Sequence, residues 1–393
     1  MAQVVILSAT RTPIGSFRGA LSGIPATRLG AAAIRGALAQ AGVDRNEVSD
    51  AIMGNVLQAG LGQAPARQAA IYGGLPSSVR CATINKVCAS GMLAVANGAL
   101  ALAAQDAEIV VAGGMENMSA SPYLLPEARM GYRMGNQQVI DSMIHDGLWD
   151  PYGNAHMGSC AEACARKYGY SREQQDAYAV ESFRRANAAQ EEGLLNREIT
   201  PVAITDARGI VANVDRDEGP SKVNYDRIPT LRPAFDGAGT ITAANASTIS
   251  DGAAALVLAT SEAAKSRGIK PVGRLVSFGS HSQDPLWFTT APVRAAQIAL
   301  QRAGWNGADV DLWEVNEAFA VVPMAFMQEL AVPHGRLNVR GGAISLGHPI
   351  GASGARILVT LLAALRQRGL RRGVAAICIG GGEGMAACVE AEA

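Results

Sequence analysis

The 393-residue chain has no surplus of charge of either sign and few aromatic side chains. Lysine plus arginine and aspartate plus glutamate each number 34, so the formal net charge is zero, and aromatic residues make up 5% of the chain. Proteins that hold nucleic acid or an anionic membrane by general electrostatics carry a basic surplus, so this balance argues against both partners. A phosphorylated ligand is still compatible, because a few local charges suffice to bind it.

Long apolar runs and targeting signals are also missing. No apolar stretch approaches the roughly 20 residues that a membrane-spanning helix requires. Residues 1–3 lack a basic region and lead directly into a strand-like run, and residues 391–393 are not a peroxisomal signal. We therefore expect a cytoplasmic protein without a membrane partner.

Cysteine is scarce for a chain of this length. The six cysteines stand at positions 81, 88, 160, 164, 378 and 388. They do not read as a disulfide framework and show no paired zinc-ligand spacing, so we expect reduced thiols and no metal. Cys160 and Cys164 fall one helical turn apart, which is compatible with a redox pair or with two small buried residues.

Small and apolar residues are abundant and recur in a pattern. Hydrophobic residues make up 49% of the chain, which fits a globular protein with a large core. Residues 33–42 read as an amphipathic helix with a Gly stop, followed by a strand that ends at Asn55; residues 296–304 begin the same series, which ends at Asn316. The repeat, at offsets near 262, indicates two duplicated α/β halves with largely buried sheets.

The duplication is interrupted by an insert. Residues 119–249 have no counterpart in the second half and are rich in Met, Gly, Pro and charge. We interpret residues 1–118 with 250–270 as the N-terminal half and residues 271–393 as the C-terminal half. The segment 119–249 is then an inserted loop domain over one half, a place where functional residues often lie.

Cys88 is the first candidate for chemistry. It follows a strand-like run and precedes an Ala-rich helix. The positive end of a helix dipole favours a thiolate, and the small residues after Cys88 leave room for a substrate. An isolated cysteine in such surroundings is more often a core residue, so Cys88 alone does not decide.

Three further candidates lie in the second half. His348 stands among glycines just before a helix, roughly at the repeat position of Cys88, where an imidazole can act as a base or cap a turn. Cys378 ends a strand before Gly380, and its thiol can move a proton or pack in the core. Asn316 ends another strand, where its amide can hold a water or cap a helix.

Four motifs, taken together, resemble the thiolase family. They are Cys-Ala-Ser-Gly at 88–91, Asn-Glu-Ala-Phe at 316–319, Gly-His-Pro-Ile-Gly-Ala-Ser-Gly at 347–354 and Cys-Ile-Gly-Gly-Gly at 378–382. The similarity runs from Val4 to about Val389. It implies the five-layered αβαβα thiolase fold. It also implies an acyltransferase that joins two acetyl-CoA molecules reversibly into acetoacetyl-CoA and free CoA.

The resemblance implies a role for each motif residue. Cys88 would be the acylated nucleophile, His348 would activate it, and Cys378 would move the proton during carbon–carbon bond formation. Asn316 would hold a water that forms one oxyanion hole with His348, and the backbone N–H groups of Cys88 and Gly380 would form the other. CoA thioesters are the substrates in this chemistry, which implies no cofactor and no metal.

The resemblance also places the substrate. The inserted domain would cover the CoA arm, with Ser247 near the pantetheine and with His156 and Met157 at the reactive end. By their charge, the basic residues Lys222, Arg184 and Arg227 are candidates to contact the CoA phosphates. The apolar positions that match the pocket, each also compatible with ordinary packing, are Leu148, Phe235, Ala318 and Phe319.

Two positions depart from the family pattern. Pro220 stands where one well-known member has Arg, so the phosphate contacts must differ from those of that member. Phe288 and Thr289 replace a Met-Gly pair of the short-chain members, so we expect an altered acyl pocket that prefers acetoacetyl-CoA. If Trp287 and Phe288 turned outward, they would open a channel for longer tails, as in a degradative 3-ketoacyl-CoA thiolase.

Two other function classes fit less well. Ketoacyl synthases that act on carrier proteins use two histidines, or His and Asn, with the cysteine, and the Cys378 motif argues against them. The presence of Cys88, His348 and Cys378 argues against a catalytically silent acyl-CoA-binding scaffold. Thiolases that resemble this chain are dimers or dimers of dimers, so we expect a homodimer or homotetramer.

Overall fold

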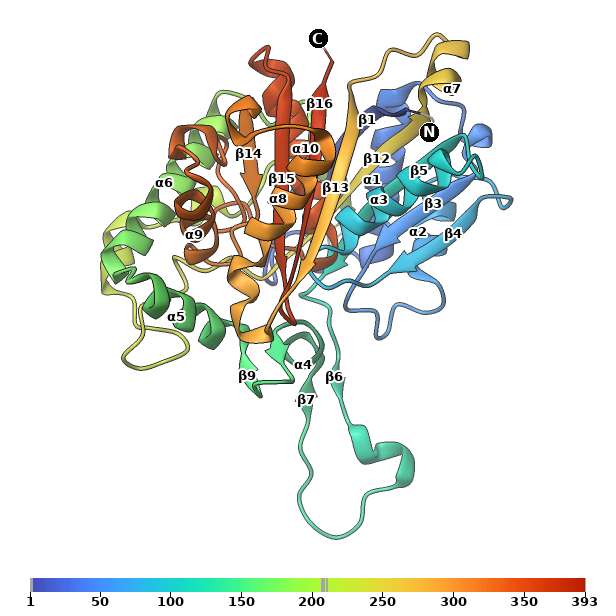
Figure 1. Cartoon of the computed structure of the whole chain (residues 1–393). Coiled ribbons are helices and arrows are strands. Elements are labelled where there is room, and N and C mark those ends of the chain that lie inside the picture. The colour runs from blue at the N-terminus through green and yellow to red at the C-terminus, as the bar shows by residue number, and fades with distance from the viewer. Residues whose placement is uncertain (1–2, 206–208, 210, 393) are drawn as a thin grey trace.

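The N-terminal half is an α/β unit built on five long strands (Figure 1). The computed structural model describes residues 3–205, 209 and 211–392; the outermost residues of the predicted halves, 1–2 and 393, lie outside this range. The strands are β1 (Val4–Arg11), β3 (Asp50–Gly54), β4 (Arg80–Ile84), β5 (Ile109–Asn117) and β12 (Ser250–Thr260), with the short β2 (Gly15–Ser16) beside β12. The helices are α1 (Ala26–Ala41), α2 (Pro65–Tyr72), α3 (Ser90–Ala103) and α7 (Ser261–Ser266).

The C-terminal half repeats this order of elements, except that no strand of its described residues corresponds to β4. Its strands are β13 (Gly273–Ser282), β14 (Leu312–Val315), β15 (Arg372–Ile379) and β16 (Glu383–Ala391), and its helices are α8 (Ala291–Ala303), α9 (Val321–Leu330) and α10 (Ile350–Gln367). In both halves a parallel pair (β3 with β5, β14 with β15) is followed by antiparallel pairing to the next strand (β12, β16). The predicted duplication is confirmed.

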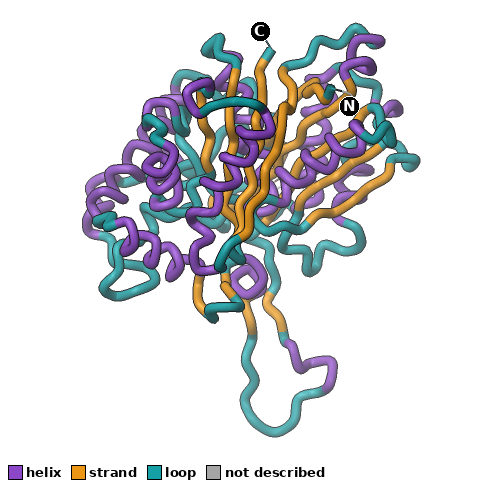
Figure 2. The backbone as a smooth tube through the Cα atoms, viewed as in Figure 1, coloured by secondary structure: helices purple, strands orange, loops and turns teal. Residues whose placement is uncertain are grey.

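The helices and strands form five layers, αβαβα (Figure 2). Helices α1 and α2 pack with β1, β3, β5 and β12 in one apolar cluster, and α8 and α9 pack with β14 and β15 in another. A third cluster holds α3 and α10 together with strands of both halves. The two half-sheets also join edge to edge, because β1 pairs with β13 at Val5 and Ile6.

Glycines allow the two central helices to touch near their first turns. A Cβ on Gly91 would lie 2.8 Å from the backbone nitrogen of Ala355, and a Cβ on Gly354 would lie 2.6 Å from that of Met92. Since Gly91 and Gly354 are repeat counterparts, the same residue type is needed on both helices. This contact brings the N-terminal ends of α3 and α10 side by side.

The segment between β5 and β12 holds more regular structure than the predicted loop domain suggests. It contains α4 (Ser142–Gly147), α5 (Met157–Tyr168) and α6 (Arg172–Glu191), which begins with a capping box at Ser171. The short strands are β6 (Tyr123–Leu124), β7 (Ile140–Asp141), β8 (Trp149–Asp150), β9 (Ala155–His156), β10 (Val202–Thr205) and β11 (Val211–Val214).

Buried ion pairs fasten this segment to both halves. Arg11 on β1 donates to Asp217 at 2.7 Å and to Glu198 at 2.8 Å, and Glu198 also accepts from Arg340 at 3.1 Å. All four side chains are at most 2% exposed. Moving the segment away from the strand ends would separate these partners and leave buried charges unpaired, which is strongly destabilising. The network therefore holds the segment in place.

Short 3₁₀ turns complete the chain, and one part protrudes from it. The turns are η1 (Arg45–Glu47), η2 (Pro126–Met130), η3 (Pro220–Lys222), η4 (Tyr225–Thr230), η5 (Pro285–Thr290), η6 (Gly307–Asp309) and η7 (His334–Arg336). The arm between β6 and β7 extends away from the layers (Figure 1). Within the described ranges, none of the helices combines the length and apolarity that crossing a bilayer requires.

Candidate active site

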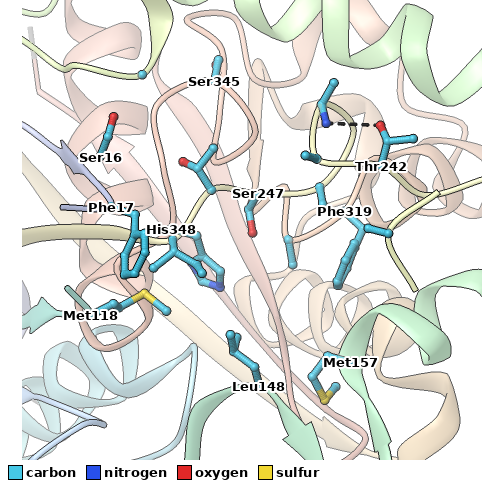
Figure 3. Close-up of a pocket in the computed structure, with 18 of the residues that line it drawn as sticks. Ser16, Phe17, Met118, Leu148, Met157, Thr242, Ser247, Phe319, Ser345 and His348 are labelled. Carbon is cyan, nitrogen blue, oxygen red and sulfur yellow. Dashed lines mark hydrogen bonds between the residues drawn. The ribbon is translucent and has the colours of Figure 1, made fainter. Parts of the chain in front are cut away.

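A mostly apolar cavity of about 840 Å³ opens between the inserted segment and the strand ends of both halves. Figure 3 shows the His348 ring, Ser247 and Phe319 directed toward the space beside Leu148 and Met157. The predicted site residues that line this cavity are Cys88, Leu148, His156, Met157, Lys222, Phe235, Ser247, Ala318, Phe319, His348 and Gly380. Two others, Cys378 and Asn316, are fully buried beneath its surface.

Cys88 sits on a strained turn just before α3. The preceding Val87 has φ 46°, a left-handed conformation that is costly for a β-branched residue. The Ser90 hydroxyl stabilises the turn by accepting from the Lys86 N–H at 2.8 Å and donating to the Val87 carbonyl at 2.6 Å. These two hydrogen bonds hold the backbone of the turn in its strained conformation. Cys88, at the end of the turn, lines the cavity.

Burial and neighbouring groups shift the pKa of the Cys88 thiol in opposite directions. Burial raises the pKa of the Cys88 thiol to about 11, and the backbone N–H groups of Gly380 and of Cys88 itself oppose this by hydrogen bonding. The negative charge of Glu116 raises the pKa further. The resting side chain is therefore a neutral thiol with two N–H groups aimed at it, and it needs a base to become a nucleophile.

His348 enters the cavity from a glycine turn. Gly347 has φ 117°, and a Cβ there would lie 2.3 Å from Ser250 Oγ, so only glycine fits. Burial lowers the pKa of His348 to about 3, with a further contribution from the positive charge of Arg356, so the ring is neutral. Its Nδ1 lies 2.6 Å from Ser353 Oγ.

The Ser353 contact assigns the tautomer of the ring. Ser353 donates its hydroxyl proton to the Pro349 carbonyl at 2.9 Å, so its oxygen accepts from His348 Nδ1–H. The Nε2 atom then carries a free lone pair and can take a proton. Asn316 Nδ2 lies 3.4 Å from Nε2, and Asn316 Oδ1 has no hydrogen-bond partner in the described part of the chain.

Cys378 lies near the end of β15, behind the glycine loop. Burial, with the thiols of Cys88 and Cys164, raises the pKa of Cys378 well above its ordinary value. Beyond it the chain turns sharply, since Gly381 and Gly382 both have φ 89°. This turn presents the Gly380 N–H to the Cys88 sulfur.

An ion pair ties the two catalytic loops together. Lys86 Nζ, two residues before Cys88, lies 2.5 Å from Glu383 Oε2 at the start of β16. The contact joins the Cys88 turn of one half to the glycine loop of the other. Both side chains are partly exposed, so we assign the pair a role in alignment rather than a large share of stability.

Comparison with known proteins agrees with this geometry. Residues 4–262 match the thiolase N-terminal domain, and residues 269–391 match the thiolase C-terminal domain. The chain belongs to the thiolase family. It is 51% identical over 391 residues to an acetyl-CoA acetyltransferase of Cupriavidus necator, covering 99% of this chain and 100% of the relative.

Two further relatives span nearly the whole thiolase chain. Acetyl-CoA acetyltransferase 2 of Arabidopsis thaliana is 50% identical over 389 residues, covering 98% of this chain and 96% of the relative. The crystal structure of the Bacillus anthracis acetyl-CoA acetyltransferase superposes with a TM-score of 0.97 at 38% identity, covering 100% of this chain and 99% of that one. The thiolase fold is thereby confirmed.

Aromatic rings form one wall of the thiolase cavity. His156 stacks on Phe235 at 4.5 Å, and Phe319 meets both Phe235 (6.1 Å) and Phe288 (6.4 Å) edge to face. Phe288 lines the cavity and is only 3% exposed. Trp287 does not line it and packs against Lys167 Nζ at 4.3 Å. The arrangement with both rings turned outward is therefore absent.

Basic side chains are unevenly placed at the cavity mouth. Lys222 and Arg227 line it, whereas Arg184 does not and pairs with Glu181 at 3.1 Å, so the suggestion of Arg184 as a phosphate ligand is not supported. Lys222 lies 3.5 Å from Glu218. The exposed Arg227 guanidinium has no side-chain partner among the described residues.

The cysteines other than Cys88 and Cys378 are buried or partly buried. Cys160 and Cys164 on α5 are 2% and 0% exposed and belong to the apolar cluster of the C-terminal half. All six cysteines are free thiols. No group of three or more His, Cys, Asp and Glu side chains in residues 3–205, 209 and 211–392 is arranged to hold a metal ion.

Sequence reasoning assigned no role to several residues of the site. Ser353 on α10 contacts His348 Nδ1, while the charges of Arg356 on α10 and Glu116 on β5 shift the pKa values of His348 and Cys88. Ser353 and Glu116 both lie in motifs that resemble the thiolase family, so their positions were visible. Their partners were not, because each contact joins segments that are set against each other only by the folded layers.

Proposed function

We propose that this thiolase joins two acetyl-CoA molecules into acetoacetyl-CoA and CoA through an acyl-Cys88 intermediate, and that it also catalyses the reverse thiolysis. The observation that carries the proposal is the Cys88 sulfur facing two backbone N–H groups, in a cavity that also presents the neutral His348. The acetyl-CoA acetyltransferase names of full-length relatives support the substrate.

In the first half-reaction, Cys88 becomes acylated. His348 Nε2 takes the thiol proton, and the resulting thiolate attacks the thioester carbon of acetyl-CoA. The tetrahedral oxyanion is bound by N–H donors, and its collapse breaks the bond to the CoA sulfur, which leaves with the proton from His348. The acetyl group on Cys88 keeps its thioester energy for the second step.

In the second half-reaction, Cys378 moves the proton on carbon. For this step the Cys378 thiol gives its proton to His348, which CoA release left neutral, and the Cys378 thiolate then takes an α-proton from a second acetyl-CoA. The enolate carbon attacks the acetyl carbonyl on Cys88, the bond to the Cys88 sulfur breaks as the new carbon–carbon bond yields acetoacetyl-CoA, and the departing Cys88 thiolate takes the proton back from His348. The Oδ1 atom of Asn316 can hold a water that, with the Nε2–H of His348 in its protonated form, binds the enolate oxygen.

A single assay distinguishes this proposal from the other function classes. Acetoacetyl-CoA and CoA should be converted into two acetyl-CoA, followed by the loss of the enolate absorbance. A ketoacyl synthase would require carrier-protein substrates, and a silent scaffold would bind acetoacetyl-CoA without consuming it. Absence of turnover with CoA substrates would reject the proposed activity.

Phe288 is expected to set the limit on chain length. Its buried ring occupies the cavity wall that a longer acyl tail would need, and forcing a tail against a packed ring costs about 1–3 kcal/mol. In Phe288→Ala we expect kcat/KM for eight-carbon 3-ketoacyl-CoA to rise roughly ten- to a hundredfold relative to the four-carbon substrate.

The control for this prediction is Trp287→Ala, which removes a neighbouring ring that does not line the cavity. The ratio of eight-carbon to four-carbon kcat/KM should stay at its wild-type value in that variant. A wild-type enzyme whose kcat/KM already rises from four to sixteen carbons would instead identify a degradative 3-ketoacyl-CoA thiolase.

Arg227 is expected to bind a phosphate of CoA. Its guanidinium, which has no side-chain partner in residues 3–205, 209 and 211–392, stands at the cavity mouth, and Pro220 supplies no cation nearby. In Arg227→Gln we expect KM for acetyl-CoA to rise about fivefold, equivalent to roughly 1 kcal/mol at an exposed rim. With acetylpantetheine, which carries no phosphate, the wild type and the variant should have equal KM values.

Two variants test whether Arg227 is specific in this role. Arg184→Gln removes an exposed charge outside the cavity and should leave KM unchanged for both substrates, while Lys222→Gln measures the second cation at the mouth. An equal rise in KM for acetyl-CoA and acetylpantetheine in Arg227→Gln would assign Arg227 to packing and not to phosphate binding.

The protruding arm supports an assembly of more than one chain. Several of its apolar side chains are not covered by the rest of the chain: Tyr123, Leu125, Met130, Met134 and Val139 are between 49% and 102% exposed. Exposed apolar groups gathered on one projection are typical of contact sites, so we propose that further copies cover the arm in a homotetramer. Light scattering would give the molar mass.

We further infer a cytoplasmic location. The proposed chemistry needs Cys88 and Cys378 as reduced thiols, and all six cysteines are free in the structure. Reducing compartments keep such thiols free. Fractionation of cells that express the protein, followed by thiol labelling, would test this.

A further inference from the structure

Glu116 occupies a defined register position in the N-terminal half. On the parallel strands β3 and β5, Gly54 stands opposite Gly114. One residue beyond Gly54 is Asn55, and two residues beyond Gly114 is Glu116. On the other side of β5, Glu116 pairs with Gly252 of β12.

The same steps in the C-terminal half lead to the active site. On β14 and β15, Val315 stands opposite Ala376. One residue beyond Val315 is Asn316, and two residues beyond Ala376 is Cys378. Cys378 pairs with Gly384 of β16, again a glycine. The counterpart of Cys378 in the N-terminal half is therefore a glutamate, and the counterpart of the active-site asparagine is Asn55.

The Glu116 carboxylate is fully buried and surrounded by hydrogen-bond donors. Its Oε1 accepts from Asn55 Nδ2 at 2.8 Å and from the Leu57 N–H at 3.2 Å, and its Oε2 accepts from the N–H groups of Val56 at 3.0 Å and Gly351 at 2.9 Å. Burial raises the pKa of Glu116 to about 7, although these N–H groups favour its charged form. No lysine or arginine of the described ranges forms an ion pair with it.

The contact with Gly351 fixes the start of α10. Gly351 lies three residues after His348, and Ser353, which orients the His348 ring, stands on the same turn. The packing has no room for a side chain at either glycine. A Cβ on Gly351 would lie 2.7 Å from Glu116 Oε2, and a Cβ on Gly114 would lie 2.1 Å from the Gly351 carbonyl oxygen. The helix N-terminus also favours a negative charge at this point.

We propose that Glu116 is a positioning residue of the condensation, whose carboxylate holds the first turn of α10, and with it the His348 ring, in register with Cys88. It does not line the cavity and touches no substrate. The inference rests on the proposed function. The equivalent register position therefore holds Cys378, the second thiol, in the C-terminal half and Glu116, which positions His348, in the N-terminal half.

The decisive variant is Glu116→Gln. Each carboxylate oxygen accepts from two donors, so the amide nitrogen of glutamine faces N–H groups in either orientation. We expect kcat for thiolysis, and the exchange of label between acetyl-CoA and CoA, to fall roughly ten- to a hundredfold, because displacing a catalytic group by about 1 Å can cost on the order of a hundredfold. KM for acetyl-CoA should change by no more than about twofold, since the cavity surface is unchanged.

Glu162→Gln is the matched control. Glu162 on α5 is 2% exposed and likewise accepts from two backbone N–H groups, those of Thr240 and Ile241, without an ion-pair partner among the described residues. Like Glu116 it is buried and accepts from backbone N–H groups, but within the described ranges none of its hydrogen bonds reaches α10. We expect a similar loss of thermal stability in the two variants, with kcat of Glu162→Gln within about twofold of the wild type.

Glu116→Asp covers the case in which the glutamine variant does not fold. The shorter carboxylate keeps its acceptors but cannot reach all four donors, so kcat should lie between the values of the wild type and Glu116→Gln, with KM unchanged. A folded Glu116→Asp or Glu116→Gln with wild-type kcat and exchange overturns the inference, as does an equal loss of kcat in Glu162→Gln. A wild-type enzyme without thiolase turnover would instead reject the proposed function.

Discussion

Replacing Cys88 by serine should abolish both condensation and thiolysis, with kcat lower by on the order of 10⁴-fold or more. A hydroxyl is a far weaker acid than a thiol. The imidazole assigned to activate it, that of His348, is buried and has a pKa of about 3, so it is too weak a base to generate an alkoxide. The measurement is the consumption of acetoacetyl-CoA together with mass spectrometry of the acetylated protein, which should label wild-type Cys88 alone.

Cys160→Ser provides the matched control for this experiment. Cys160 is also a buried thiol of the same region, but it does not line the cavity, so its variant should keep the wild-type label on Cys88. A stable acetyl group found on Cys378 or Cys160, and never on Cys88, would contradict the assigned nucleophile.

The second large effect is expected from Cys378→Ala, which should separate the two half-reactions. Condensation should fall by about 10³-fold, in the range typical for the loss of a group that transfers a proton on carbon. Acylation of Cys88 should persist, because it depends on His348 and the N–H groups at the sulfur and not on Cys378. Exchange of label between acetyl-CoA and free CoA reports acylation alone, and a condensation assay reports both steps.

Cys164→Ala controls for the loss of a buried thiol beside Cys378. Condensation and exchange should both remain in that variant, apart from the modest destabilisation that a small core cavity brings. If Cys378→Ala lost exchange to the same degree as condensation, while its thermal unfolding matched that of Cys164→Ala, the proposed division of labour between the two thiols would be wrong.

Much of the fold follows from local patterns in the sequence. The period of apolar residues, the glycine stops and the recurrence of both near an offset of 262 predict two α/β halves, and the structure has these elements in that order. Cys88, His348, Cys378 and Asn316 were found for the same reason. Each stands at the end of a strand or the start of a helix, inside a short motif that can be read without knowing the fold.

The contacts that tune those residues depended on the tertiary structure. Ser353 orients the His348 ring, and Phe288 faces the cavity while its neighbour Trp287 packs elsewhere. Periodicity reports which side of an element is apolar, but not the rotamer or the partner across a layer.

The same holds for charged side chains. Nothing in the local sequence distinguishes Arg184 from Arg227. In the structure Arg227 on η4 lines the cavity mouth, whereas Arg184 on α6 lies outside the cavity and pairs with Glu181. Glu116 meets Gly351 across 235 positions of chain. Such contacts form only when the glycine-lined faces of β5 and α10 pack together, so their distances come from the close packing of layers and not from any local stretch of the sequence.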